Sequence, residues 1–97
     1  MTNPIPPILL VDDEPQILLG YSMMLQTAGI KDVLTVEDSR NVMPLLSQQD
    51  VALVILDLTM PYISGNELLT EIRRDFPHIP VIIITATNNL EIGRAHV

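Results

Sequence analysis

Three aspartates follow two of the most apolar segments of the chain. Asp12 and Asp13 come directly after the aliphatic run Ile8–Val11, and Asp57 follows the run Val51–Leu56. Carboxylates that converge on one site raise one another's pKa unless a positive charge compensates them. Carboxylate oxygens are also the ligands that Mg²⁺ prefers in proteins. If the fold brings these three side chains together, we expect a magnesium site.

A single aspartate at the end of a strand is usually a turn residue or a helix cap. That simpler reading suits Asp38, Asp50 and Asp75. It does not account for two adjacent acids after four aliphatic residues, because such a pair serves no packing purpose. We therefore interpret the Asp12, Asp13 and Asp57 set as functional.

Four apolar segments predict the strands that must carry these aspartates. Ile8–Val11, Val51–Leu58 and Val81–Thr85 are continuous rather than alternating, which is typical of strands buried on both faces. A weaker segment, Asp32–Val36, predicts a shorter strand nearer the edge of the sheet.

Between these segments the apolar residues recur at helical spacing, which predicts three helices. Ser39 is expected to cap the second helix, and Pro44 to delay its start or bend it. Alternating strands and helices indicate an α/β fold with a mostly parallel sheet, whose ligands bind at the carboxyl ends of the strands. The three apolar stripes are Ile17, Tyr21, Met24, Leu25 and Ala28; Val42, Leu45 and Leu46; and Leu68, Leu69, Ile72 and Phe76.

The composition excludes several classes of function. The 97 residues fit one domain, and the net charge of -7 disfavours direct binding to nucleic acids or anionic membranes. The chain has no cysteine, its segment Met1–Pro7 does not resemble a signal peptide, and no apolar run reaches the roughly 20 residues of a membrane helix. We expect a soluble cytoplasmic protein that contacts neither nucleic acid nor membrane.

Three motifs resemble those of a response-regulator receiver domain. They are Ile8–Pro15 with its acidic pair, Leu56–Pro61 followed by Gly65, and Pro80–Ala86. The motifs occur in the family's order and spacing and cover most of the chain. The resemblance implies a flavodoxin-like open parallel sheet of strand order 2-1-3-4, with helices on both faces.

The resemblance also implies roles for the acidic residues. Asp57 is the expected phosphoacceptor, which takes the phosphoryl group with the help of Mg²⁺. Asp13 and Asp57 are expected to ligate the ion directly, Asp12 mainly through a metal-bound water, and Thr59 through its backbone carbonyl.

Further expectations concern the phosphoryl group and the partner. The resemblance implies that the Thr85 hydroxyl and the Ala86 amide contact the phosphoryl oxygens. The expected donor is a sensor histidine kinase or a phosphotransfer protein. The expected role is a conformational switch rather than an enzyme, since such a domain assists only its own phosphorylation and dephosphorylation.

Two alternatives remain open at this point. A phosphohydrolase with an aspartate nucleophile shares a related α/β fold, although such enzymes typically carry a second acid at the position of Thr59. An inert, truncated receiver fragment is the other alternative.

The sequence departs from the family after its fourth predicted strand. Only twelve residues follow Thr85, which are too few for a crossover helix, a fifth strand and a last helix. The family's lysine on the fifth strand is therefore expected to be missing, and Lys31 is predicted at the opposite edge. We interpret residues 1–97 as a partial receiver domain that is native-like to about residue 90, and Glu91–Val97 as a non-native tail that resembles a translated sequencing adapter.

Overall fold

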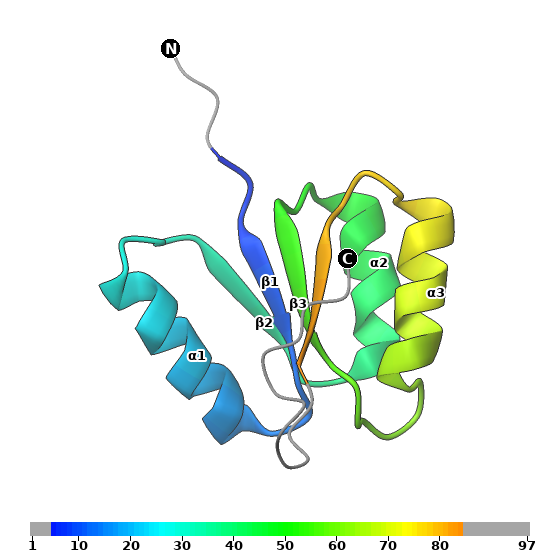
Figure 1. The fold of residues 1–97 in the computed structure, drawn as a ribbon, viewed down its shortest axis with the longest axis horizontal. Helices are drawn as coiled ribbons and strands as arrows, with labels where there is room; N and C mark the ends of the chain where they lie inside the picture. Colours follow the sequence, from blue (N-terminus) through cyan, green and yellow to red (C-terminus); the bar gives the residue numbers. More distant parts are fainter. Residues whose placement is uncertain (1–4, 85–97) are drawn as a thin grey trace.

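Four short aliphatic segments form one parallel sheet in the computed structural model, which describes residues 5–84 (Figure 1). The strand order is β2-β1-β3-β4, so the predicted order 2-1-3-4 is confirmed. Because strands buried on both faces need apolar residues at every position, their sequences are almost free of polar residues. The strands are β1 (Ile8–Val11), β2 (Val33–Val36), β3 (Leu53–Asp57) and β4 (Val81–Ile84).

The register brings the ends of the two central strands together. Val11, the last residue of β1, pairs with Val36 and with Leu56, and Asp57 pairs with Ile84 at the end of β3. The carboxyl ends of all four strands therefore meet at one edge, where the acidic residues follow.

Helices cover both faces of the sheet, as predicted (Figure 1). The first helix lies on one face, and the other two lie side by side on the opposite face. A short 3-10 turn, η1, precedes the second helix. The bounds are α1 (Pro15–Thr27), η1 (Ser39–Asn41), α2 (Val42–Gln48) and α3 (Gly65–Asp75).

The start of α2 differs from the prediction. Ser39 does not cap this helix; instead Asp38 caps η1, with its carboxylate accepting a hydrogen bond from the backbone N–H of Arg40. Helix α2 begins only at Val42, which leaves Pro44 in the first turn. A missing N–H costs nothing there, since the N–H groups of a first turn have no partner within the helix. Pro44 is thus accommodated by a late start rather than by a bend.

The buried face of α1 is also rotated from the predicted stripe. Leu18 is the buried residue of this helix, whereas Ile17 and Met24 are exposed. The apolar residues of α1 extend around much of its surface, so their spacing did not define one face.

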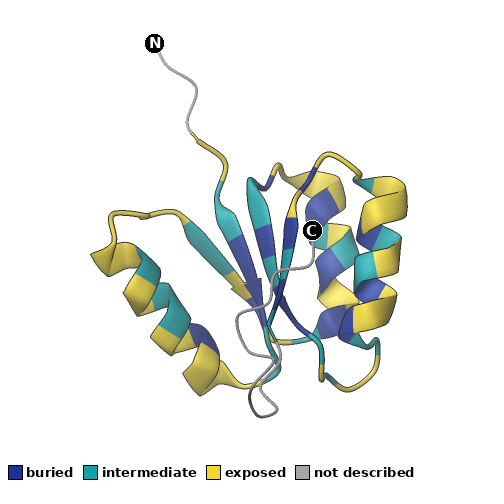
Figure 2. Cartoon of the chain, viewed as in Figure 1, coloured by how far each residue is buried: buried dark blue, intermediate teal, exposed yellow. Residues whose placement is uncertain are grey.

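The core lies between the sheet and the pair α2 and α3 (Figure 2). Both helices contribute fully buried aliphatic side chains to it, among them Val42, Leu68 and Ile72. No helix in the described part of the chain is long and apolar enough to cross a membrane. The predictions for Thr85, Ala86 and residues 91–97 lie outside the described residues.

Candidate functional site

Asp12 and Asp13 lie in the turn that links β1 to α1. The N–H of Asp12 donates to the carbonyl of Val36, which continues the pairing of β1 with β2 beyond the strand. Its carboxylate accepts a hydrogen bond of 2.9 Å from the N–H of Glu14, the residue that precedes α1. Both aspartates are half-buried. The turn therefore holds two carboxylates close to the end of the sheet.

Asp57 is the last residue of β3 and is only 8% exposed. It lies within the predicted strand Val51–Leu58 and pairs with Ile84 in the ladder. Its side chain lines a crevice together with Asp12, Leu18 and Tyr21. Asp57 consequently lies on the face of the sheet that α1 covers, beneath the turn that holds the acidic pair.

The structure brings the three carboxylates of the predicted metal site together. One carboxylate oxygen each from Asp12, Asp13 and Asp57 lies within 4.8 Å of the others. An all-oxygen, all-anionic donor set is suited to a hard divalent cation. These residues therefore fit a Mg²⁺ ion.

Burial and neighbouring charge both disfavour the ionised form of Asp57. Burial is the larger cause, and with the negative charge of Asp12 it raises the pKa of Asp57 to about 6. A backbone hydrogen bond from Thr59 acts in the opposite direction. The pKa of Asp12 is raised as well, mainly by burial and further by the charge of Asp13. A cation among these carboxylates would relieve the repulsion.

The loop after Asp57 is held close to the strand by a glycine. The N–H of Gly65 donates to the carbonyl of Leu58 at 3.1 Å. A Cβ atom at this position would lie 2.5 Å from the carbonyl oxygen of Asp57 and 2.5 Å from the Cα of Leu58. Only glycine permits this approach without a backbone shift. The sequence predicted Gly65 as part of the phosphoacceptor motif, and the structure supplies a steric reason for it.

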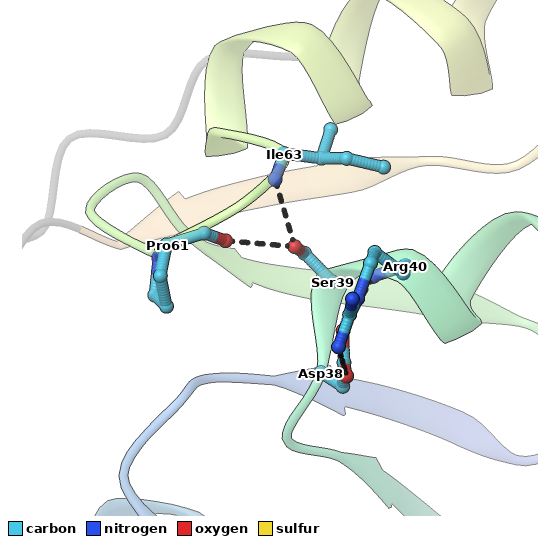
Figure 3. A network of polar contacts seen from close by, with 5 residues as sticks. All are labelled: Asp38, Ser39, Arg40, Pro61 and Ile63. Atoms are coloured by element: carbon cyan, nitrogen blue, oxygen red, sulfur yellow. Dashed lines mark hydrogen bonds and ion pairs between the residues drawn. The ribbon is translucent and has the colours of Figure 1, made fainter.

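Sequence reasoning missed one contact near the site, which involves Ser39. Its buried hydroxyl donates to the carbonyl of Pro61 at 3.0 Å and accepts from the N–H of Ile63 at 3.1 Å (Figure 3). No local signal could have revealed this pairing, because the partners are 22 and 24 residues away in the chain.

The larger hollows of the described surface lie away from the aspartates. Two of them, of about 470 and 490 Å³, flank Ile5 and Pro6 and are lined by Lys31 and Asp32. Both are at the edge where the strands begin, so Lys31 is at the opposite edge from Asp57, as predicted. Neither hollow contributes to the acidic site.

Comparisons with known proteins agree with this geometry. The sequence matches the response regulator receiver domain family over residues 8–96. It is 37% identical to the transcriptional regulatory protein GlrR of Escherichia coli (strain K12) over 83 residues, which are 86% of this chain and 18% of GlrR. It is 33% identical to the chemotaxis protein CheY-3 of Vibrio cholerae over 81 residues, which are 81% of this chain and 62% of CheY-3. The chain thus spans less than two thirds of these relatives.

Solved structures show the same fold. The response regulator protein TrrA of Thermotoga maritima, crystallised in complex with Mg²⁺-BeF, superposes with a TM-score of 0.81 at 36% identity and covers 87% of this chain and 72% of its own. TrrA in complex with the histidine kinase ThkA superposes with a TM-score of 0.80 at 33% identity, and the match covers 96% of this chain and 77% of the other.

Proposed function

The chain belongs to the response regulator receiver domain family, and we propose that it accepts a phosphoryl group on Asp57 with the assistance of Mg²⁺. One observation carries the proposal: the oxygens of Asp12, Asp13 and Asp57 lie within 4.8 Å of one another at the carboxyl ends of the strands. In an open parallel sheet this is the edge where ligands bind.

The residues around Asp57 suit it to the role of nucleophile. Its carboxylate oxygen attacks the phosphorus, the bond to the donor breaks, and the bonding electron pair leaves with the donor. When bound, Mg²⁺ supplies charge screening between the carboxylates and the incoming phosphoryl oxygens. Asp13 and Asp57 hold the ion directly in this proposal, Asp12 acts through water, and the backbone carbonyl of Thr59 is the third protein ligand. Phosphoryl transfer then needs mainly positioning, which the strand ends provide.

The two residues expected to contact the phosphoryl oxygens, Thr85 and Ala86, keep that role as a proposal. We also propose that the phosphoryl donor is a sensor histidine kinase or a phosphotransfer protein, and that the protein is cytoplasmic. The complex of TrrA with the histidine kinase ThkA supports the choice of donor class. We propose a stoichiometric switch without catalytic turnover, in keeping with a family whose members act as phosphoacceptors.

Labelling with a small phosphodonor tests the proposal. We expect wild type incubated with acetyl phosphate and Mg²⁺ to gain one phosphoryl group by intact mass spectrometry. Asp57→Asn should gain none, and Asp13→Asn should be labelled much more slowly. Asp75→Asn is the matched control, since Asp75 is exposed at the end of α3 and pairs with Arg74. It should behave like wild type.

Two outcomes contradict the proposal. Unlabelled wild type with an intact fold would favour an inert domain. Continuous hydrolysis of p-nitrophenyl phosphate that depends on Asp57 would favour the phosphohydrolase alternative.

A further inference from the structure

Ser39 is the most buried polar residue of the described chain, with 2% of its surface exposed, yet it lies on none of the family motifs. Its hydroxyl bridges the backbone on both sides of Tyr62, as donor to Pro61 and acceptor from Ile63 (Figure 3). A buried hydroxyl that both donates and accepts a hydrogen bond is held in one orientation.

The bridge closes a turn that the chain does not adopt readily. Tyr62 has a φ of 69°, in the left-handed region that a bulky residue seldom occupies. Tyr62 makes a second contact with the same segment, because the guanidinium of Arg40 lies 3.9 Å from the centre of its ring. Asp38 in turn holds Arg40 through hydrogen bonds of 3.0 and 2.8 Å. The segment 38–40 therefore contacts the turn at its backbone, through Ser39, and at the side chain of Tyr62, through Arg40.

This turn belongs to the loop that connects Asp57 to α3 and includes Thr59. The loop is closed at its base by the hydrogen bond between Gly65 and Leu58. Met60 and Ile63 of this loop pack against the core, and Ser39 supplies the two hydrogen bonds that hold its backbone on the side of η1. Movement of the loop at Ser39 would reach Thr59 and the Asp57 carboxylate to which Thr59 is hydrogen-bonded.

We infer that Ser39 is a positioning residue, which fixes the β3–α3 loop and thereby the oxygen ligands of the divalent cation. The inference rests on the proposed function, because it assigns Ser39 a role in the same Mg²⁺ site. Without the hydroxyl, the carbonyl of Pro61 and the N–H of Ile63 lose their partner. They regain hydrogen bonds by turning toward water, and the loop shifts with them.

Mg²⁺ affinity, measured by isothermal titration calorimetry on the full chain, separates positioning from stability. We expect Ser39→Ala to weaken Mg²⁺ binding by about tenfold, the lower end of the effect of residues that orient metal ligands. Ser39→Thr, which keeps a hydroxyl, should restore affinity to within about twofold of wild type. If Ser39→Ala does not fold, Ser39→Cys replaces it, since a thiol of similar size is a weak hydrogen-bonding group.

Ile72→Val is the control for general destabilisation. Ile72 is fully buried on α3, and its carbonyl accepts a hydrogen bond from the N–H of Phe76 rather than from the loop. This variant should lower the melting temperature but leave the Mg²⁺ dissociation constant within about twofold of wild type. Wild-type affinity in the Ser39 variant, or an equal loss in Ile72→Val, would overturn the inference. Absence of Mg²⁺ binding by folded wild type would instead overturn the proposed function itself.

Discussion

Helices α3 and α1 cover opposite faces of the same sheet and are specified very differently. Helix α3 buries Gly65, Leu68 and Ile72 within 11 residues, whereas α1 buries only Leu18 within 13. Helix α3 also begins with a capping box, has an acid in its first turn and has two arginines in its last. Helix α1 has Pro15 at its start but no side-chain cap and no such charges.

The core and the acidic cluster thus lie on opposite faces of the sheet. The buried positions of the strands, such as Val54 and Leu56, face α2 and α3 and form the core. On the other face Leu10 is also buried, but Ile55, Ile82 and Ile84 are only half-buried. Asp57 belongs to this second face. Packing in the core thus offsets the electrostatic repulsion between the carboxylates at the strand ends.

Truncating matched leucines on the two helices should give the largest difference. Leu68→Ala removes a fully buried side chain from the core and should cost about 3 kcal/mol of unfolding free energy. Leu19→Ala removes a side chain of α1 that is 62% exposed and should cost less than about 0.5 kcal/mol. Urea unfolding of both variants measures the contrast. Equal losses would show that α1 is as tightly packed as α3.

Removing the charge of Asp57 should stabilise the protein when no cation is bound. Because its pKa is raised to about 6, the folded state binds more protons than the unfolded state just below that pH. Stability should therefore fall as the pH rises through about 6. Asp57→Asn should remove this loss and raise the free energy of unfolding by up to about 3 kcal/mol at pH 7.

Thermal unfolding at pH 5 and pH 7.5 with a chelator, for wild type and Asp57→Asn, measures the effect. Millimolar Mg²⁺ should stabilise wild type at pH 7.5 but not the variant, since the ion binds the ionised carboxylates. A wild type that becomes more stable with rising pH, relative to Asp57→Asn, would contradict the raised pKa.

The two helices each contain a glycine, and alanine at the two positions should have opposite effects on stability. Gly65→Ala places a Cβ atom against the backbone of Asp57 and Leu58 and should cost about 1–3 kcal/mol. Gly20→Ala in α1 meets no atom within 4 Å and should stabilise the protein by about 0.5–1 kcal/mol, because alanine favours a helix interior. Chemical denaturation should show that the free energy of unfolding falls in Gly65→Ala and rises in Gly20→Ala. A destabilising Gly20→Ala would mean that α1 is more closely packed than the structure indicates.

Loss of the α3 cap should have the smallest effect. Ser64 accepts a hydrogen bond from the N–H of Glu67, and Glu67 accepts one from the N–H of Ser64. Ser64→Ala should cost about 1 kcal/mol. Ser47→Ala, which removes an exposed hydroxyl bonded to the carbonyl of Met43, is the control and should change stability by less than about 0.5 kcal/mol. If the two variants melt alike, the cap contributes nothing to α3.

Much of the fold could be predicted from local pattern. Strand β1 has the bounds that were predicted, and β4 begins at the predicted residue, Val81, because continuous aliphatic runs bounded by acids and prolines favour strands over other structures. The parallel arrangement followed from the alternation of strands and helices. Bringing Asp12, Asp13 and Asp57 together required only that parallel strands end at one edge.

Other features depended on contacts through space. The predicted stripe of α1 was right only for Tyr21 and Leu25, which are half-buried, whereas Ile17 and Met24 are exposed and Leu18 is buried. Which side of an apolar helix is buried depends on the sheet beside it. The sequence also predicted Ser39 as a cap, because a serine before a helix usually has that role, whereas its true partners come from a loop more than 20 residues away. The need for glycine at position 65 likewise appears only once the backbone of Asp57 lies next to it.

The order of the elements, the edge of the sheet where the aspartates gather and the residues that meet there could all be read from the sequence. Those features follow from the period of the apolar residues and from the alternation of strands and helices, which one stretch of chain contains. The packing of distant segments sets how deeply Asp57 is buried, how far its pKa is raised and which hydrogen bonds Ser39 makes to the loop beside it. These properties arise from distances between segments far apart in the chain, and no local pattern encodes such distances.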